Sequence, residues 1–505
     1  MRLTELFEGT DAALTPDAAG VDVRALTVDS RAVPAGALFA ALPGAARDGA
    51  DFAAQAVSSG AVAILSQRAI KTLPAVNVVA PDARRAFSLA AARFHGEPSR
   101  RLNLFGVTGT NGKTTTAHLL EQLSAARGLR TGLLGTVENR WPGGSQKATH
   151  TTPESHELQA LLKKMLDAGA QVVAMEVSSH ALSQQRVAGC VFAGAAFTNL
   201  TRDHLDYHGT LERYFDAKAS LFKDLLPRGA PAVLNLDDPR CAALAKAKEL
   251  LQHHVLGFTT RGAPGAALSA EDLQSSLAGL RFRLRLRAPL DQALVDIQSP
   301  LIGAHNAENL LAALGLLLGS GVDARELARL VPEAKGAPGR LERVADPFGR
   351  IVLVDYAHTD DALARVLDAV RAAAGSGPRL VCVFGCGGDR DRGKRPLMGE
   401  AAGRRADLVV ATSDNPRTED PEAILRDVEP GLERSGLEKL STAGERGYCI
   451  VPDRREAIRV AVASARPGDA VLIAGKGHED YQIVGSEKRP FDDRVEARRA
   501  LEVRR

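Results

Sequence analysis

The residues best suited to chemistry form a glycine-rich segment, Gly109-Thr-Asn-Gly-Lys-Thr-Thr-Thr116, between an apolar run and a helix-like stretch. Backbone N–H groups in such a loop, with a helix N-terminus behind them, bind phosphate oxygens. Lys113 would neutralise the β- and γ-phosphates, and the Thr114 hydroxyl would bind Mg²⁺. General phosphate loops have glycine where this chain has Val107, so we expect Gly106 and Gly109 to provide the backbone freedom. The alternative is a structural turn. The residues expected to bind ATP here are Gly109, Thr110, Asn111, Gly112, Lys113, Thr114 and Thr115.

Two polar side chains that follow strand-like runs could complete a metal site beside this loop. Glu176 ends an apolar run, and a carboxylate at the carboxyl end of a neighbouring parallel strand lies beside bound phosphates and can hold Mg²⁺. His204 follows the next run, in Thr198-Asn-Leu-Thr-Arg-Asp-His-Leu-Asp206. Each has a plain alternative, because a lone acid is often a surface loop residue and a lone histidine an ordinary hydrogen-bonded one.

Alternating strand-like and helical patterns divide the chain into three regions. Up to about residue 100, short apolar runs alternate with alanine-rich helical stretches, which predicts a small α/β unit. The second region opens with the run Arg101–Thr108, followed by a helical pattern from about Thr114 to Arg127. Its further runs, separated by helical stretches, predict a doubly wound, mostly parallel sheet. The runs are Ala25–Asp29, Ala37–Leu42, Ala61–Leu65 and Ala75–Val79, then Gln171–Val177, Gly194–Thr198 and Ala232–Leu236.

The second region ends near Lys335-Gly-Ala-Pro-Gly339, a Gly/Pro-rich linker candidate. A weaker alternating segment before it, Gly279–Arg287, could be an antiparallel addition to the sheet. The third region repeats the α/β theme. Its strand-like runs are Ile351–Val354, Arg379–Phe384, Ala406–Ala411 and Ala470–Ala474.

Composition and charge exclude several classes of protein. The 505 residues carry a net charge of only +3, which gives no reason to expect a nucleic acid or a membrane surface as partner. No apolar run reaches the ~20 residues that span a bilayer, and the N-terminus lacks a signal-peptide pattern. The five cysteines are scattered, and Cys382 and Cys386 lack a second pair that would suggest zinc. We therefore expect a cytoplasmic protein with free thiols.

Six ordered blocks within residues 109–358 resemble those of the Mur ligase family. The phosphate loop reads as the family's does, including the absent glycine at Val107. The other five blocks are Glu176-Val-Ser-Ser-His180, Thr198-Asn-Leu-Thr-Arg-Asp-His204, Gly303-Ala-His-Asn-Ala-Glu-Asn309, Pro338-Gly-Arg340 and Val354-Asp-Tyr-Ala-His358. This resemblance implies further ATP contacts from Asn306, Arg340 and Asp355.

The resemblance also implies a three-domain α/β protein. A small UDP-sugar-binding domain (1–100) and a Rossmann-like domain that carries the incoming amino acid (338–505) would flank a central P-loop-type, doubly wound ATPase domain (101–337). With ATP and Mg²⁺, the protein would phosphorylate a peptide carboxylate, and an amine would then displace the phosphate. Lys113, Glu176, His204 and Lys218 would be the catalytic residues. Screening two polyanions by Mg²⁺ and Lys113 fits this chemistry.

Lys218 resembles the lysine that the family carries as a carbamate. Its segment, Tyr214-Phe-Asp-Ala-Lys-Ala219, follows Asp206-Tyr-His-Gly209 as in the family. The modification would turn a cation into an anionic Mg²⁺ ligand, beside Thr114, Glu176 and His204. Without the resemblance, Lys218 would be read as a solvated helix lysine.

The segment Asp414-Asn-Pro-Arg417 looks like the signature of the diaminopimelate-adding members of the family. The far end of meso-diaminopimelate carries an ammonium and a carboxylate, which Asp414 and Arg417 can bind. L-Lysine lacks that carboxylate and would leave Arg417 buried without a partner, at a cost of roughly 3–5 kcal/mol if desolvation is complete. The segment also has the character of a turn, since Asn-Pro favours one. The full expected set is Arg390, Asp414, Asn415, Arg417, Gly475 and Glu479.

The resemblance is weaker for the site of the other substrate, UDP-MurNAc-L-Ala-D-Glu. Asp29-Ser-Arg31 matches the family's N-terminal motif, whereas Gly44-Ala-Ala-Arg-Asp-Gly49 lacks the histidine that relatives often carry, which changes the expected uracil contacts. The residues expected to bind this substrate are Ser30, Thr151, Thr152, Ser178, Gln184 and Arg186.

Three rival functions remain. A lysine-adding ligase is disfavoured by Arg417, and a folate- or amino-acid-polymerising ligase by Asp29-Ser-Arg31. A non-catalytic nucleotide-binding protein is disfavoured by the presence of Lys113, Glu176 and Lys218. A dinucleotide site at Gly385-Cys-Gly-Gly388 is rejected, because the third glycine of that fingerprint is missing. We expect a monomer that acts on small molecules.

Overall fold

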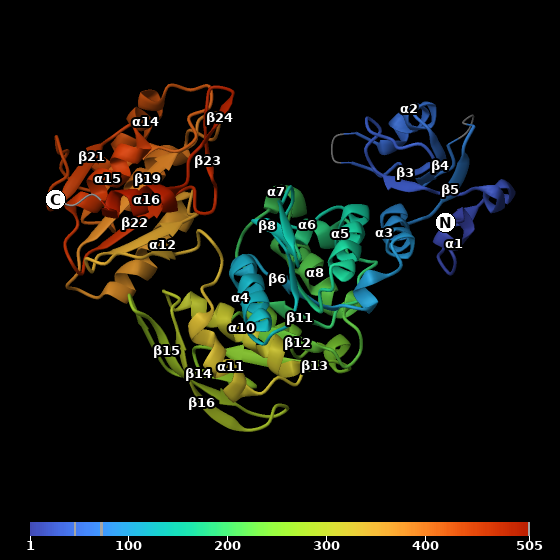
Figure 1. Cartoon of the computed structure of the whole chain (residues 1–505), viewed down its shortest axis with the longest axis horizontal. Helices are drawn as coiled ribbons and strands as arrows, with labels where there is room; N and C mark the ends of the chain where they lie inside the picture. Colours follow the sequence, from blue (N-terminus) through green and yellow to red (C-terminus); the bar gives the residue numbers. More distant parts are fainter. Residues whose placement is uncertain (45–46, 71–73, 503–505) are drawn as a thin grey trace. The chain divides into compact units, whose positions relative to one another are not determined.

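The computed structural model describes residues 1–44, 47–70 and 74–502. The chain divides into two compact units. Figure 1 labels their helices and strands. The first comprises Met1–Leu268, Leu286–Gln292 and Leu311–Asp323, and the second comprises Ser269–Arg285, Ala293–Leu310 and Ala324–Arg505. Each unit is described by itself.

The first unit begins with a five-stranded sheet in the order β1-β5-β4-β3-β2, parallel except for β1. Buried alanine, valine and leucine side chains on its strands pack against α1 and α3. The Asp82 side chain caps α3 by accepting a hydrogen bond from Arg85 N. The elements are α1 (Leu3–Leu6), β1 (Ala13–Leu14), β2 (Ala25–Thr27), β3 (Ala37–Ala40), α2 (Ala53–Ser58), β4 (Ala61–Ser66), β5 (Val76–Val79) and α3 (Ala83–Phe94).

A second sheet in the first unit runs β13-β12-β11-β6-β10-β7-β8-β9. Its strands are parallel from β13 to β7, while β8 and β9 are antiparallel additions. The strands are β6 (Asn103–Thr108), β7 (Thr131–Leu134), β8 (Glu138–Trp141), β9 (Gly144–Lys147), β10 (Val172–Glu176), β11 (Gly194–Phe197), β12 (Pro231–Asn235) and β13 (His254–Thr259). All side chains of β10, β11 and β12 are buried, as expected for strands covered on both faces.

Helices connect the parallel strands of this sheet and place their loops at its carboxyl edge. They are α4 (Lys113–Ala126), α5 (Ser155–Asp167), α6 (Ser179–Ser183), α7 (Leu205–His208), α8 (Leu211–Ser220) and α9 (Pro239–Leu244). The C-terminal part of α10 (His305–Gly319) also belongs to this unit. In an open parallel sheet, the carboxyl edge is where ligands bind.

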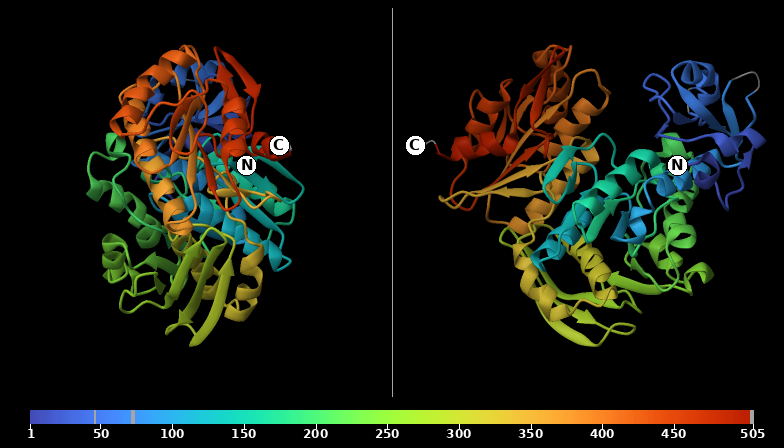
Figure 2. Two further views of the ribbon diagram at one scale, coloured as in Figure 1. Left: turned by 90° about the vertical axis from the view of Figure 1, so that its left-hand side faces the viewer. Right: turned by 45° about the vertical axis from the view of Figure 1, so that its right-hand side comes forward.

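The second unit contains three strands and a larger α/β sandwich. Figure 2 shows β14 (Leu268–Ser276), β15 (Gly279–Leu286) and β16 (Ala293–Ser299) side by side as a twisted ribbon in yellow-green. The predicted strand Gly279–Arg287 is confirmed as β15. A short helix, α11 (Ala324–Leu330), follows later in the chain.

The sandwich is built on a six-stranded sheet in the order β17-β18-β22-β19-β20-β21, parallel except for β17. One face packs against α12, α13 and α14, and the other against α15 and α16. The strands are β17 (Glu342–Val344), β18 (Ile351–Asp355), β19 (Leu380–Cys386), β20 (Leu408–Ser413), β21 (Gly447–Ile450), β22 (Ala470–Ala474), and the separate hairpin β23 (Tyr481–Val484) and β24 (Glu487–Pro490). The helices are α12 (Asp360–Ala374), α13 (Lys394–Gly403), α14 (Pro421–Arg434), α15 (Arg454–Ser464) and α16 (Asp493–Glu502).

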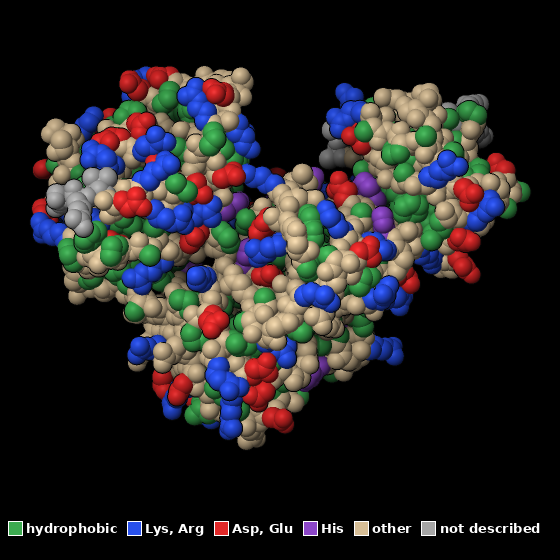
Figure 3. Space-filling model, in the orientation of Figure 1, with side chains coloured by type: hydrophobic (Ala, Val, Ile, Leu, Met, Phe, Trp, Pro, Cys, Tyr) green, Lys and Arg blue, Asp and Glu red, His purple; other side chains and the backbone are tan. Residues whose placement is uncertain are grey.

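The α/β class and the three-domain architecture are thus confirmed, and each predicted strand lies within two residues of an observed one. In the described part of the chain, no helix has the length and apolarity to cross a membrane. Figure 3 shows acidic and basic side chains interspersed over the visible face, in keeping with the small net charge.

Candidate functional site

The glycine-rich segment forms a turn between β6 and the first residue of α4, as its sequence predicts. Gly109 and Gly112 adopt φ values of +145° and +86°, which side-chain-bearing residues rarely adopt. The Lys113 Nζ folds back to donate to Gly109 O at 2.8 Å and Thr110 O at 2.9 Å. The Lys113 ammonium therefore lies over the loop, where it can meet a phosphate.

Gly106 does not provide the backbone freedom expected of it, so that expectation is wrong. Gly106 lies inside β6 and has no left-handed conformation. A Cβ at this position would come 2.9 Å from the Phe192 ring, so Gly106 allows close packing under the loop. Gly109 alone of the two provides backbone freedom.

Glu176 ends β10 and pairs in register with Val107 on β6, so its carboxylate meets the loop. It is 1% exposed. It accepts hydrogen bonds from Thr114 Oγ1 at 2.9 Å and from Thr136 Oγ1 and N at 3.0 and 2.8 Å. The surface-acid alternative is therefore wrong, and Thr136 is a site residue that the sequence analysis missed. Its only signal is its place at the exit of β7.

Lys218 is also buried, at 1% exposure, and donates to Gly109 O at 2.8 Å. Burial and, secondarily, the nearby Lys113 charge lower the pKa of the Lys218 amine well below its usual range. Its Nζ lies 4.6 Å from the centre of the Tyr214 ring, and the Tyr214 hydroxyl is 3.2 Å from Thr110 Oγ1. A solvated helix lysine is thus excluded. The fold places this amine under the phosphate loop.

His204 stands at the edge of this group, with a half-exposed side chain and a left-handed φ of +51°. Its ring lies 6.1 Å from Tyr214 and 4.9 Å from His180, centre to centre. His208 packs against the same rings, and its Nε2 is 3.0 Å from Ser179 Oγ. Burial lowers the His208 pKa to about 4, so its ring is neutral. The structure therefore brings His204 beside an imidazole cluster that the sequence analysis did not single out.

Four of the residues expected to bind the UDP-linked substrate form one network. Thr152 Oγ1 donates to Glu176 O at 2.8 Å and accepts from Ser178 N at 3.0 Å. Arg186 donates to Thr152 O at 2.9 Å and to Gln184 Oε1 at 2.7 Å. Thr151 joins the network through Thr136, since their hydroxyls are 3.0 Å apart.

Glu154 is a second residue that the sequence analysis missed. Its carboxylate forms a 2.7 Å ion pair with Arg186. Together with Gln184 it lines a cavity of about 180 Å³, along with Val28, Ala40, Leu42, Gly49 and Arg84 from the N-terminal α/β region. Residues of the N-terminal α/β region therefore meet Gln184, one of the expected substrate-binding residues, in one cavity.

Ser30 lies next to Val28 but contacts none of this network through a described hydrogen bond. It stands between Asp29 and Arg31, whose side chains form a bidentate pair with 2.9 Å contacts, and the pair lowers the pKa of Asp29 to about 2. The segment Gly44–Gly49 lacks the histidine that relatives often carry, and different uracil contacts were expected there. Residues 45–46 of this segment lie outside the described residues.

In the second unit, Asp355 ends β18 and is 8% exposed. It accepts from Leu341 N at 2.8 Å and Ala357 N at 2.9 Å, while burial raises the pKa of its carboxyl. Arg340 lies 4.9 Å over the Tyr356 ring. Asn306 donates to Ile302 O at 2.8 Å at the start of α10. The structure thus places Asp355 and Arg340 around one strand end and Asn306 on a separate helix start.

The residues expected to bind diaminopimelate follow the ends of two strands. Asp414 and Asn415 come directly after β20, and Gly475 comes directly after β22. Asn415 Nδ2 donates to Glu479 Oε2 at 3.2 Å. Gly475 has φ +122°, and a Cβ there would point at Asp414, 3.8 Å from its Cγ. These four residues therefore share one site.

Arg417 and Arg390 differ from expectation. Arg417 is partly exposed and already donates to Gly388 O at 2.8 Å. The condition of complete desolvation on which that penalty depended is not met here, because Arg417 is partly exposed and the Gly388 carbonyl already accepts from its guanidinium. Arg390 is exposed and donates to the neighbouring Asp389 O, and it contacts no other predicted site residue through a described hydrogen bond.

Two buried bases below these loops were not assigned a role from the sequence. Lys476 has no exposed side-chain surface and lies 3.2 Å from Asp414 Oδ1. Arg454 is also fully buried and forms a bidentate pair with Asp493, with both contacts at 2.7 Å. Arg454 also donates to Ser413 O and Ala474 O, the last residues of β20 and β22.

Comparisons with known proteins match all three regions of the chain. Family descriptions match residues 22–95 (Mur ligase family, catalytic domain), 107–317 (Mur ligase middle domain) and 339–477 (Mur ligase, glutamate ligase domain). A UDP-N-acetylmuramoyl-L-alanyl-D-glutamate–2,6-diaminopimelate ligase from Gloeobacter violaceus is 48% identical over 510 residues, covering 100% of this chain and 99% of the relative.

Solved structures agree. The structure of a UDP-N-acetylmuramoyl-L-alanyl-D-glutamate–2,6-diaminopimelate ligase superposes with a TM-score of 0.73 at 37% identity, covering 99% of both chains. A MurF ligase from Thermotoga maritima, solved in complex with ADP, shares the fold with a TM-score of 0.56 at 19% identity, covering 90% of this chain and 94% of the other.

Proposed function

The chain belongs to the Mur ligase family, and we propose that it joins meso-diaminopimelate to the D-glutamate carboxylate of UDP-MurNAc-L-Ala-D-Glu at the expense of ATP. The γ-phosphoryl group of ATP passes to the carboxylate, the amine attacks the acyl phosphate, and phosphate leaves the tetrahedral intermediate. Peptidoglycan synthesis consumes the product. The observation that carries this proposal is the meeting of Asp414, Asn415 and Glu479 in the loops that follow β20 and β22, the two strands on either side of β19.

The phosphate loop and its surroundings supply the electrostatics for phosphoryl transfer. Lys113 neutralises charge that builds up on the transferred phosphoryl group, as positioned cations do in such reactions. The Thr114 hydroxyl and the Glu176 carboxylate, 2.9 Å apart, form an oxygen donor pair of the kind that Mg²⁺ prefers. Mg²⁺ bound there would draw charge from the phosphates and the substrate carboxylate. His204 lies at the rim of the same group and is the third proposed ligand.

We propose that Lys218 is the fourth ligand, as a carbamate. The described residues contain no group of three His, Cys, Asp or Glu side chains placed to hold a metal, so an added carboxylate would complete the set. Burial favours the neutral amine of Lys218, which is the form whose nitrogen attacks the carbon of CO₂ and releases a proton. Intact-mass measurement of active enzyme tests this: unmodified Lys218 throughout an active sample would rule it out.

The substrate carboxylate must reach the phosphate loop from the network of Thr151, Thr152 and Ser178. Thr152 Oγ1 touches the backbone of Glu176, so the peptide end of the UDP-linked substrate would lie beside the metal site. Gln184 and Arg186 would bind farther from the loop, toward the cavity that Val28 and Gly49 line. Ser30 would contact the uridine side, which places the long substrate along the first unit.

In the second unit, Asn306, Arg340 and Asp355 are the proposed remaining ATP contacts. Asp414 and Glu479 would bind the distal ammonium of meso-diaminopimelate. Arg417 would bind the distal carboxylate, and Arg390 would reach the same end of the molecule. Gly475 leaves room for that head. We also propose the domain limits 1–100, 101–337 and 338–505, a monomeric state and a cytoplasmic location, where ATP is available.

The decisive experiment measures ADP release with ATP, Mg²⁺ and UDP-MurNAc-L-Ala-D-Glu in parallel reactions with meso-diaminopimelate, L-lysine or no amino acid. Product mass identifies the bond made. Turnover with meso-diaminopimelate alone, lost in Arg417→Ala, supports the reaction and the selectivity. Equal turnover with lysine would show that Arg417 does not read the distal carboxylate. No turnover with any amino acid would overturn the proposed function.

A further inference from the structure

Lys476 is a buried lysine that contacts both of the loops that follow β20 and β22 in the second unit. Lys476 Nζ donates to Asn415 Oδ1 at 2.9 Å and to Tyr481 O at 2.8 Å. It also lies 3.2 Å from Asp414 Oδ1 and 3.9 Å from Glu479 Oε2. One ammonium thus contacts both loops that follow β20 and β22.

The contacts of Asn415 fix the direction of its amide. Its Oδ1 accepts from Lys476 Nζ and from Ile483 N at 3.0 Å. With two donors facing the oxygen, the Nδ2 group is directed to Glu479 Oε2. Lys476 is therefore one of two donors that prevent this amide from flipping, and Asn415 in turn holds Glu479 in place.

Lys476 lies between a closed ion pair and two further acids. Arg454 and Asp493 form a closed pair of their own. Lys476 pairs directly with two acids, Asp414 and Glu479. Asp414 Oδ1 is buried and, apart from its 3.2 Å ion pair with Lys476, accepts no hydrogen bond from the described residues. Buried polar atoms of this kind are normally satisfied, so the site is built to receive one more donor.

From these contacts we propose that Lys476 is a positioning residue for the incoming amino acid: it aligns Asp414, Asn415 and Glu479 so that together they accept one ammonium group. This rests on the proposed function, in which the distal ammonium of meso-diaminopimelate occupies that place. Lys476 itself makes no contact with the reacting atoms. Burial lowers the pKa of the Lys476 amine, and the adjacent Asp414 carboxylate acts in the opposite direction.

The test separates positioning from a general structural role by comparing Michaelis constants. Lys476→Met keeps the length and removes the charge and the donors. We expect KM for meso-diaminopimelate to rise roughly tenfold to hundredfold, the usual cost of losing hydrogen bonds to charged groups. The KM values for ATP and for the UDP-linked substrate should stay within about twofold. Lys439→Met is the matched control, because Lys439 is an exposed lysine of the same domain that pairs with Glu429.

A double-mutant cycle sharpens the test. If Lys476 acts through Asp414, then Lys476→Met added to Asp414→Asn should raise KM little further, because coupled residues are not additive. Fully additive effects, or equal rises in all three KM values, would overturn the proposal. If Lys476→Met does not fold, Lys476→Gln, which retains two donors, is measured in its place. Wild-type enzyme that is inactive with meso-diaminopimelate would instead refute the proposed function, whereas active wild type with an unchanged variant refutes only this inference.

Discussion

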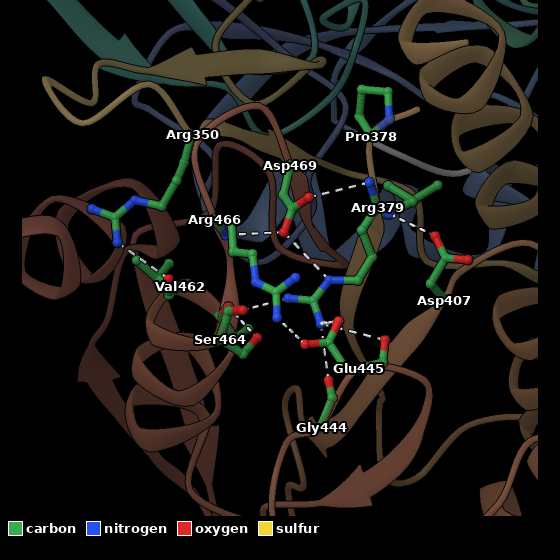
Figure 4. Close-up of polar contacts among 12 residues, drawn as sticks. Arg350, Pro378, Arg379, Asp407, Gly444, Glu445, Val462, Ser464, Arg466 and Asp469 are labelled. Atoms are coloured by element: carbon green, nitrogen blue, oxygen red, sulfur yellow. Dashed lines mark hydrogen bonds and ion pairs between the residues drawn. The ribbon is translucent and has the colours of Figure 1, made fainter. Parts of the chain in front are cut away.

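The two ends of the six-stranded sheet carry similar charged groups arranged in opposite ways. At the amino end, Arg379 donates to Asp469 Oδ2 at 3.3 Å, to Gly444 O at 3.0 Å and to Ser464 O (Figure 4). Asp469 also accepts from Arg379 N at 3.2 Å and Arg466 N at 2.9 Å. Both oxygens of this acid are used.

At the carboxyl end, Asp414 faces Lys476 but keeps one buried oxygen without a hydrogen bond from the described residues. The acid at the amino end thus has both of its oxygens used as acceptors, whereas the acid at the carboxyl end keeps a buried acceptor without a hydrogen bond from the described residues. Parallel sheets favour this division, since loops at the carboxyl ends of strands converge and those at the amino ends close the fold. The comparison teaches that satisfied and unsatisfied buried charges distinguish structure from function here.

The largest effect is expected at the amino end. Arg379→Ala should lower the free energy of unfolding by about 3 kcal/mol, because Asp469 and several carbonyl groups lose a buried donor. Urea unfolding measures this change. The kcat/KM of the folded variant should equal that of wild type. A loss of turnover in fully folded protein would contradict the division between the two ends.

The second-largest effect is expected at the carboxyl end, in kcat/KM rather than in the free energy of unfolding. Asp414→Asn should lower kcat/KM for meso-diaminopimelate roughly tenfold to hundredfold, because the ammonium loses a charged acceptor. The free energy of unfolding should change by less than about 1 kcal/mol, since Lys476 keeps its two neutral acceptors. Steady-state kinetics and urea unfolding on one preparation check both. Strong destabilisation would make Asp414 a structural acid like Asp469.

A smaller effect is expected from pH. Burial and, in the opposite direction, Lys476 act on Glu479, and the net result is a raised pKa. Glu479 should therefore gain a proton at a higher pH than an ordinary glutamate, and it then no longer attracts an ammonium. KM for meso-diaminopimelate should rise as pH falls toward the Glu479 pKa, while KM for ATP should not follow. Glu479→Gln should remove this dependence. Parallel curves for both substrates would assign the titration elsewhere.

The smallest effect is expected at the surface beside Arg379. Arg466 pairs with Glu445 in Figure 4, and both side chains are about two-thirds exposed at 66% and 68%. Arg466→Ala should change the free energy of unfolding by less than about 0.5 kcal/mol, because water screens such pairs. Its backbone N–H still reaches Asp469. A loss of stability near that of Arg379→Ala would show that the Arg379 network depends on the exposed Arg466–Glu445 pair.

Much of the fold could be predicted because it depends on local patterns. The runs that form β22 (Ala470–Ala474) and β10 (Val172–Glu176) are fully buried parallel strands, and such strands have near-continuous apolar sequences. The edge strands β8 and β9 were missed because partly exposed strands carry mixed residues without a clear period. The junction between strand β6 and helix α4 could be predicted to within a few residues. Its glycines with positive φ and the start of the helix are encoded in eight consecutive residues.

The site could be predicted where a motif is contiguous and was missed where partners come from distant parts of the chain. Lys113, Glu176 and Asp414 stand in recognisable blocks. Thr136 and Glu154 do not, because each gains its role only when another strand or loop brings Glu176 or Arg186 beside it. Arg417 shows the converse: the residue stands in a recognisable block, but the sequence analysis overestimated its burial.

The phosphate loop, the order of the α/β elements and the resemblance to the Mur ligase family could be inferred without a fold, since these depend on residues adjacent in the chain. Which charged side chains are desolvated became known only from the folded chain. Lys218 and Lys476 look like any other lysine in the sequence, yet both are buried, because strands and helices far apart in the chain close over them. Desolvation changes what an amine can do, and it is a property of the folded surroundings rather than of the residue.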